Sequence, residues 1–183
     1  MPGTPVSCLD DDVATVVLAE VMAALWAPVP RDCGLPTVVA ECAPLALSLG
    51  LPAELVTAAR TSLVELLADP LPGRVLHGDL HHDNLLRGPD GWVAIDPHGV
   101  VGDPGYDVGP LLINPSPWLA TQDVEAVTRR RLALLADVLG QPVGRLARWG
   151  LVRAVLSECW HIQDGTTSEG VALKVAEVLM RRL

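Results

Sequence analysis

Apolar residues recur at helical spacing along most of the chain, and they predict a succession of buried and amphipathic helices. The first helix follows Asp10, Asp11 and Asp12, whose carboxylates can cap it and favour its positive end, and it runs to about Trp26. A turn-rich connector follows. Prolines, glycines and polar clusters separate the remaining helices, which we expect over residues 36–49, 52–69, 106–112, 121–139, 142–163 and 168–182.

The period of the pattern changes between residues 74 and 104. A short apolar run at 75–76 predicts a buried strand, and two further strands are predicted at 84–87 and 92–95. Residues 88–91 read Gly-Pro-Asp-Gly, and they join these two strands as a tight hairpin turn. Residues 97–104 are expected to form a loop, and a proline-rich break is expected at 114–117. The whole pattern predicts a mostly helical α+β fold in which a small β-hairpin element carries the polar residues.

Charge and composition limit the classes of partner. The chain has 183 residues, half of them hydrophobic, a length that suits one domain with a sizeable core. Its net charge of −9 disfavours nucleic-acid binding, which needs a basic face. The charge suits a cationic small-molecule substrate, although in most acidic proteins it serves solubility alone. Four cysteines without Cys-x-x-Cys spacing are expected to be free thiols in a reducing, cytoplasmic compartment.

The apolar stretch at residues 13–30 is better explained by a buried helix than by a membrane span. Glu20 lies near its centre, where a charge costs roughly 2.5–3.5 kcal/mol in a bilayer, and two prolines end the run. The residues before it are acidic, whereas a signal peptide begins with basic residues. We therefore expect no membrane association.

Three polar side chains in the β region have the layout of a phosphoryl-transfer site. Asp79 follows the first strand, Asn84 lies five residues later, and Asp96 follows the hairpin. A carboxylate in the position of Asp79 can orient the attacking hydroxyl as catalytic base, and Asn84 and Asp96 offer the oxygen ligands that Mg²⁺ prefers. Each residue alone is also a common turn or loop residue; their shared spacing favours catalysis.

Other polar residues near this motif receive supporting roles. His77 is expected to hold the catalytic loop through its ring hydrogen bonds, and Asp107 to accept backbone N–H groups of the same loop or to cap the following helix. His81 and His82 are expected to line the loop without a chemical role. Glu158 and Trp160, late in a helix, could form a substrate wall, although a Trp at helical spacing is more often part of a core.

The motifs resemble those of the aminoglycoside/hydroxyurea phosphotransferases, a branch of the protein-kinase-like small-molecule kinases. The resemblance is carried by His77-Gly-Asp79-Leu-His-His-Asp-Asn84, by Ala-Ile-Asp96-Pro-His-Gly-Val-Val-Gly-Asp103-Pro-Gly-Tyr-Asp107, and by Asn114-Pro115. It implies the C-terminal lobe of a kinase-like fold, with a helical part at 1–73, catalytic and metal-binding loops at 74–117 and C-terminal helices at 118–183. It also implies ATP as co-substrate, Mg²⁺, and a hydroxyl acceptor on a streptomycin-like aminoglycoside or hydroxyurea.

The sequence also departs from the family pattern. Lys174 is the only lysine and lies far behind the motif, and no Gly-rich phosphate loop precedes it. His98 stands where the branch would have a lysine, and Ile113 where it would have an arginine. Two alternatives stay open: a non-catalytic module that keeps the fold, and a metal hydrolase using a dense polar cluster of His77, Asp79, His81, His82, Asp83 and Asp96.

We expect the isolated chain to have little or no kinase activity, because it lacks the nucleotide-clamping half of the site, and one missing donor typically costs ~10²–10³ in rate. An apolar face that packs on that half would favour self-association or a separate N-lobe chain. Streptomycin-dependent ATP turnover and light scattering measure both. Clear turnover, or a monodisperse monomer, would count against these expectations.

Overall fold

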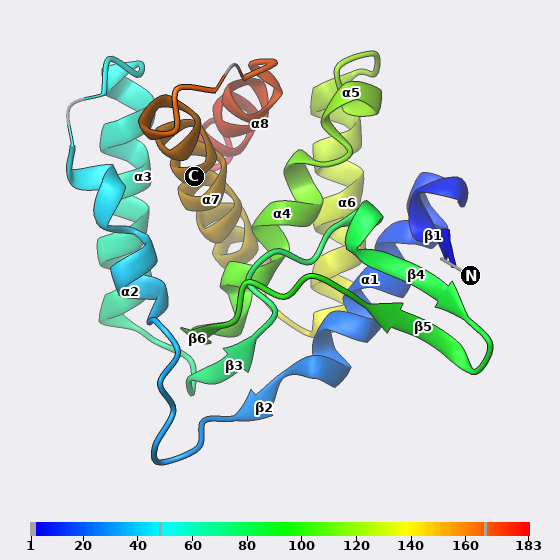
Figure 1. The fold of residues 1–183 in the computed structure, drawn as a ribbon. Coiled ribbons are helices and arrows are strands. Elements are labelled where there is room, and N and C mark those ends of the chain that lie inside the picture. The colour runs from blue at the N-terminus through cyan, green and yellow to red at the C-terminus, as the bar shows by residue number, and fades with distance from the viewer. Residues whose placement is uncertain (1–2, 48, 167) are drawn as a thin grey trace.

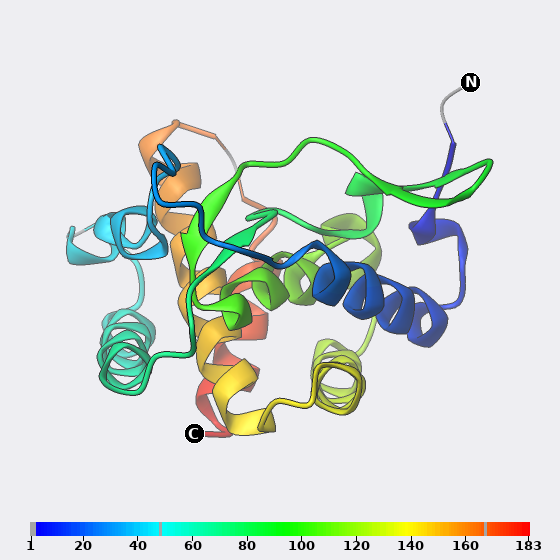
Figure 2. The same ribbon diagram turned by 90° about the horizontal axis from the view of Figure 1, so that it is seen from below.

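The computed structural model describes residues 3–47, 49–166 and 168–183, and most of them are helical. Figure 1 shows α3 (Ala53–Ala68), α7 (Val143–Gln163) and α8 (Val171–Met180) on one side and α1 (Asp11–Leu25) on the other. Between them lie α4 (Val108–Ile113) and α6 (Val124–Leu139), with α5 (Ser116–Leu119) at one end. The turned view in Figure 2 places the strands together on one face of these helices. The predicted mostly helical α+β fold is confirmed.

Two small antiparallel sheets carry the polar motif. One has the order β1-β4-β5, in which β1 (Thr4–Pro5) pairs with the hairpin of β4 (Leu85–Gly88) and β5 (Gly91–Ala94). The other has the order β2-β3-β6, formed by β2 (Ala27–Pro28), β3 (Arg74–Leu76) and β6 (Val100–Gly102). The predicted hairpin and the strand after residue 74 are confirmed. The strands β1, β2 and β6 were not predicted, because a strand of two or three residues is too short to show an alternation of apolar and polar residues.

Three expected boundaries differ from the structure. The helix expected over 36–49 is instead a short α2 (Val38–Glu41), capped by the Thr37 side chain, and then a 3₁₀ turn at Ala43–Ala46, and residue 48 lies outside the described residues. Pro44 has no N–H to continue an α-helical ladder, which explains the division. The expected break at 114–117 contains the start of α5, and the expected loop at 97–104 contains β6. The aspartate cap is confirmed, because the Asp10 carboxylate accepts from the backbone N–H of Asp12 at 3.0 Å.

Helix α7 lies at the centre of the core. It contacts α3, α4, α6 and α8, and its middle turns are buried on nearly every side. A helix that is apolar around most of its circumference belongs inside a fold, which is where α7 lies. Within the described residues, no helix combines the length and the hydropathy needed to cross a membrane.

A buried arginine ties the predicted catalytic loop, residues 77–84, to three helices. Arg131 of α6 is fully buried and donates from Nη1 to the carbonyls of Leu111 and Asn114, both at 2.7 Å. Its Nε and Nη2 donate to one oxygen of Asp11 at the start of α1, at 3.0 and 2.6 Å. These bonds satisfy the carbonyls at the end of α4 and neutralise the guanidinium, so the charge is tolerated inside the core.

His82 in the catalytic loop lies against the same guanidinium. It is 2% exposed, and its Nε2 lies 3.4 Å from Nη2 of Arg131. Because a guanidinium only donates, Nε2 accepts and the ring proton lies on Nδ1. Burial, reinforced by the Arg131 charge, lowers the pKa of His82 from 6.5 to about 3. The ring is therefore neutral in the folded chain at ordinary pH.

Acidification should destabilise the chain through His82. The unfolded chain takes up this proton as the pH falls below 6.5, whereas the folded chain binds it only near pH 3. The unfolded state binds more protons in that window, so stability is lost as the pH falls, by about 2 kcal/mol at pH 5. Between about pH 7.5 and 5, the free energy of unfolding of His82→Gln should fall by about 2 kcal/mol less than that of the wild type, as measured by urea unfolding. Equal losses in the two proteins would contradict this.

Candidate active site

The catalytic loop begins where β3 ends. Leu76 is buried in the sheet, His77 and Gly78 continue the chain, and Asp79 emerges with its side chain 39% exposed. Gly78 has φ +83°, and a Cβ there would lie 3.2 Å from the Cβ of His98. A glycine is needed because the backbone is left-handed and closely packed at this turn. The turn brings Asp79 to the surface while its strand stays in the core.

The buried carboxylate of Asp107 accepts hydrogen bonds from the backbone of this turn. Asp107 is fully buried and accepts the backbone N–H of Gly78 at 2.8 Å, the backbone N–H of His77 at 3.3 Å and the indole N–H of Trp26 at 3.1 Å. Burial raises the pKa of Asp107, while the N–H donors oppose that shift. The predicted contact between Asp107 and the loop is therefore present, and Trp26 is an additional donor that the sequence did not indicate.

The His77 ring connects the catalytic loop to the segment that carries Asp96. Its Nδ1 accepts the backbone N–H of Asp79 at 3.3 Å, so Nε2 carries the proton and donates to the carbonyl of Ile95 at 3.0 Å. Ile95 immediately precedes Asp96. One neutral imidazole thus fixes the backbone next to two of the three predicted functional residues.

Asn84 joins the same two segments from the other side. Its side-chain N–H donates to the carbonyl of Asp79 at 2.9 Å, and its own backbone carbonyl accepts the N–H of Ile95 at 3.0 Å. The amide nitrogen is thus occupied, which leaves the amide oxygen as the group able to bind a cation. Asn84 is 9% exposed and lies beneath the surface of the site.

Asp96 has an unusual backbone conformation. It is exposed, and its φ of +55° is the one positive φ among the described residues other than glycine. Aspartate adopts the left-handed region more readily than most residues, but the conformation is still strained. Such strain concentrates at functional sites. The Asn84 amide and the Asp96 carboxylate supply the oxygen donors that Mg²⁺ accepts, so this pair fits the ion that the sequence predicts.

Asp79 lies between two side chains that the sequence did not place there. Arg153 of α7 donates from Nη2 to Oδ1 of Asp79 at 3.1 Å and to the carbonyl of Gly78 at 3.3 Å. His81 places its Nε2 3.7 Å from Oδ2. Burial lowers the pKa of His81, so this ring is neutral near pH 7. The only sequence signal for Arg153 was an arginine inside the apolar stretch 150–156.

Two adjoining pockets open on Asp79. The first, of about 590 Å³, contains Asp79 and Asp96 together and is also lined by Glu41, Pro97, His98, Ile113, Asn114, Arg153, Ser157, Trp160 and Asp164. The second, of about 470 Å³, shares Asp79, Ile113, Asn114 and Ser157 with the first and adds His81, Glu158, His161 and Glu169 among others. Most of the charged side chains in both are carboxylates, which favours a cationic ligand.

The two predicted substrate residues lie in different pockets. Trp160 lines the first, where its ring stacks on the guanidinium of Arg153 with 4.4 Å between Cζ and the ring centroid. Glu158 lines the second; it is 5% exposed and accepts the Ser168 hydroxyl at 2.6 Å. Of the two departures from the family pattern, Ile113 contributes to both pockets, and His98 pairs with Glu41 at 3.1 Å.

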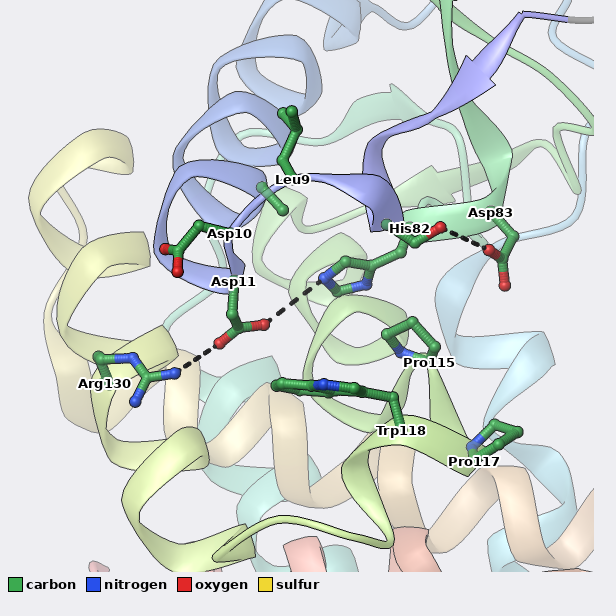
Figure 3. A pocket seen from close by; sticks show the side chains of 11 residues that line it. Leu9, Asp10, Asp11, His82, Asp83, Pro115, Pro117, Trp118 and Arg130 are labelled. Atoms are coloured by element: carbon green, nitrogen blue, oxygen red, sulfur yellow. Dashed lines mark hydrogen bonds and ion pairs between the residues drawn. The ribbon is translucent and has the colours of Figure 1, made fainter.

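A further pocket of about 560 Å³ lies elsewhere along the catalytic loop (Figure 3). His82 and Asp83 line it together with the start of α1, and Figure 3 shows His82 directed toward Asp11, above the Trp118 ring. Asp79 and Asp96 are not among its lining residues. Consecutive histidines of one motif, His81 and His82, thus line different pockets.

The histidine contacts do not favour the metal-hydrolase alternative. Both ring nitrogens of His77 are occupied, Nδ1 of His81 accepts the backbone N–H of Asp83 at 3.3 Å, and Nε2 of His82 accepts from Arg131. Across residues 3–47, 49–166 and 168–183, no group of three His, Cys, Asp or Glu side chains is placed to hold a metal ion. The cluster that is dense in sequence is dispersed in space.

Most of the chain matches one known protein family. The family described as aminoglycoside/hydroxyurea antibiotic resistance kinase matches residues 5–165. The chain belongs to this family. The resemblance seen in the motifs is therefore confirmed, and so is its association with kinases that confer antibiotic resistance.

The relatives of this chain are longer than the chain itself. It is 38% identical over 189 residues to streptomycin 6-kinase of Streptomyces glaucescens, a match that covers 96% of the chain and 61% of that protein. It is 33% identical to hydroxyurea phosphotransferase of Kitasatospora aureofaciens, over 90% of the chain and 44% of that protein. The chain thus spans less than two thirds of the length of these relatives.

Solved structures support the kinase-like fold. The structure of choline kinase from Streptococcus pneumoniae matches with a TM-score of 0.63 at 14% identity, and the match covers 99% of this chain and 66% of the choline kinase chain. A thermostable mutant of aminoglycoside phosphotransferase APH(4)-Ia matches with a TM-score of 0.61 at 19% identity, and the match covers 98% of this chain and 69% of the phosphotransferase chain. The predicted fold class is confirmed.

The path of the Arg153 side chain depends on a glycine of α4. A Cβ at Gly109 would lie 2.2 Å from Cβ and Cγ of Arg153, so Gly109→Ala should reduce stability by about 1–3 kcal/mol through overpacking. At Gly144 an added Cβ would lie 3.5 Å from Nη1 of Arg148, an ordinary contact, and Gly144→Ala should be neutral or stabilising by up to about 1 kcal/mol. Urea unfolding compares them. Equal effects of the two substitutions would show that Gly109 is not needed for this contact.

Proposed function

We propose that this chain provides the catalytic carboxylate and the metal ligands for transfer of the γ-phosphoryl group of ATP to a hydroxyl of a small, cationic acceptor of the aminoglycoside type, or of hydroxyurea. The observation that carries the proposal is that Asp79 and Asp96 line one pocket, while His77 and Asn84 hydrogen-bond across the two segments. The names of the relatives, streptomycin 6-kinase and hydroxyurea phosphotransferase, indicate the acceptor class.

Asp79 has the role of base in this reaction. Its carboxylate accepts the proton of the acceptor hydroxyl as the new O–P bond forms, while the bond between the γ-phosphorus and its bridging oxygen breaks and ADP leaves with that oxygen. Asn84 and Asp96 would hold Mg²⁺, which when bound neutralises charge on the phosphates. Asp107 and His77 hold the two segments in a fixed relative position, so that the carboxylates of Asp79 and Asp96 are oriented before the substrates arrive.

The acidic lining supports a cationic acceptor. Glu41, Asp96 and Asp164 surround one pocket, and Glu158 and Glu169 contribute to the other. An amino or guanidino group near these carboxylates would be attracted before its hydroxyl reaches Asp79. The neutral rings of His81 and Trp160 add apolar surface for a sugar or cyclitol ring.

Mg²⁺-dependent nucleotide binding by the full chain tests the metal half of the proposal. Asp96→Ala should abolish the magnesium-dependent part of the binding, because it removes the one carboxylate of the pair. Asp90→Ala changes an exposed aspartate at the turn of the β4–β5 hairpin and should leave the binding unchanged. Calorimetry with a non-hydrolysable ATP analogue measures both.

The outcomes separate clearly. Binding that persists in Asp96→Ala would show that Asp96 is not a metal ligand, and binding lost equally in both variants would indicate unfolding instead. Once magnesium-dependent binding is established, calorimetric titration of the nucleotide-bound chain with streptomycin and with hydroxyurea distinguishes the two acceptors, and it does not require turnover by the isolated chain.

A further inference from the structure

Arg153 is a buried cation in the middle of α7. The residue is 6% exposed, and it lies in the turns of α7 that form the core of the helical part. A charge in that position is costly unless it is well paired. The arrangement around it therefore requires an explanation.

Three neighbours give the side chain a defined path. Gly109 of α4 leaves room for its Cβ and Cγ, as described above. The guanidinium then lies 4.4 Å from the centroid of the Trp160 ring and 5.6 Å from that of Tyr106. Aromatic faces attract a cation and limit its rotation. The side chain is thus directed along one path from the helix toward the catalytic loop.

The hydrogen bonds of Arg153 differ from those of Arg131, the other deeply buried arginine described here. Arg131 uses Nε, Nη1 and Nη2, and its bonds tie helices together. The hydrogen bonds of Arg153 within the described residues run from Nη2 to Gly78 and Asp79, and its buried Nε has no partner there. A buried donor without a partner destabilises the folded chain. This placement serves the orientation of the catalytic loop at the expense of stability.

We propose that Arg153 is a positioning residue that holds Oδ1 of Asp79, so that Oδ2 is the oxygen that receives the acceptor hydroxyl. The inference rests on the proposed phosphotransfer. A charge-assisted hydrogen bond occupies Oδ1 and fixes the plane of the carboxylate, since the same Nη2 also holds the carbonyl of Gly78. Oδ2 is then directed toward His81, whose neutral Nε2–H is 3.7 Å away.

This assignment gives the acceptor a direction of approach. His81 and Glu158 line the second pocket, whereas Asp96 and Arg153 line the first. A hydroxyl that meets Oδ2 on the His81 side comes from the second pocket, while the phosphates lie beside Asp96. Asp79 lies at the junction of the two, where the transfer takes place.

Two measurements on the full chain test the role of Arg153, and neither requires turnover. The first follows the side-chain carboxyl carbon of Asp79 by ¹³C NMR, with the signal assigned by its loss in Asp79→Asn. Arg153→Met should move and broaden this signal, because the carboxylate loses its fixed orientation, and Arg153→Lys should restore part of the wild-type position. Arg148→Met is the matched control: it removes another α7 arginine, paired with Glu65 at 2.6 Å, and should leave the signal unchanged.

The second measurement is a double-mutant cycle on unfolding with Arg153→Met, Asp79→Asn and the two combined. The pair should show a coupling of about tenfold in the unfolding equilibrium constant. An unmoved Asp79 signal in Arg153→Met, or a coupling close to onefold, would overturn the inference. If Arg153→Met does not fold, the Asp79 signal in Arg153→Lys decides in the same way. A chain that fails the magnesium test still answers this question, because neither readout involves nucleotide.

Discussion

The site depends on the Asp107 carboxylate, which lies beneath the catalytic loop with no exposure to solvent. Two backbone N–H groups of the loop and the indole of Trp26 all bond to this one side chain. A buried carboxylate with three donors is satisfied only in one arrangement of the chain, so it selects that arrangement. It connects the end of α1, the exit of β3 and the start of α4, and it lets Asp79 reach solvent from an otherwise rigid core.

The two deeply buried arginines, Arg131 and Arg153, have different partners and different structural roles. Arg131 bonds to carbonyls and to Asp11, and it stabilises the junction of α1, α4 and α6. Arg153 lies against aromatic rings and bonds only to the catalytic loop within the described residues. Burial alone therefore does not reveal the role of a charge. The identity of its partners does, and the partners come from distant parts of the sequence.

The sequence predicted the long helices and the β4–β5 hairpin because their signals are local: apolar spacing, caps and a turn with two glycines. Asp79, Asn84 and Asp96 were selected as candidates for the same reason, since their places beside short strands and their spacing mark them. Arg153 was not recognised, because its contact with Asp79 joins residues 74 positions apart. The two-residue strands were missed because they form only by pairing with partners already in place.

The hairpin between Asn84 and Asp96 also explains which part of the motif is free to vary. Leu85 pairs with Ala94 at the base of the hairpin, and the Asn84 carbonyl bonds to Ile95 just outside it. The relation between the two proposed ligands, Asn84 and Asp96, is set at this base, whereas the tip at Pro89 and Asp90 is exposed. A longer or shorter tip would change the number of residues between Asn84 and Asp96 without moving either of them. Searches for distant members of the family should therefore allow a variable spacing here instead of a fixed separation of twelve positions.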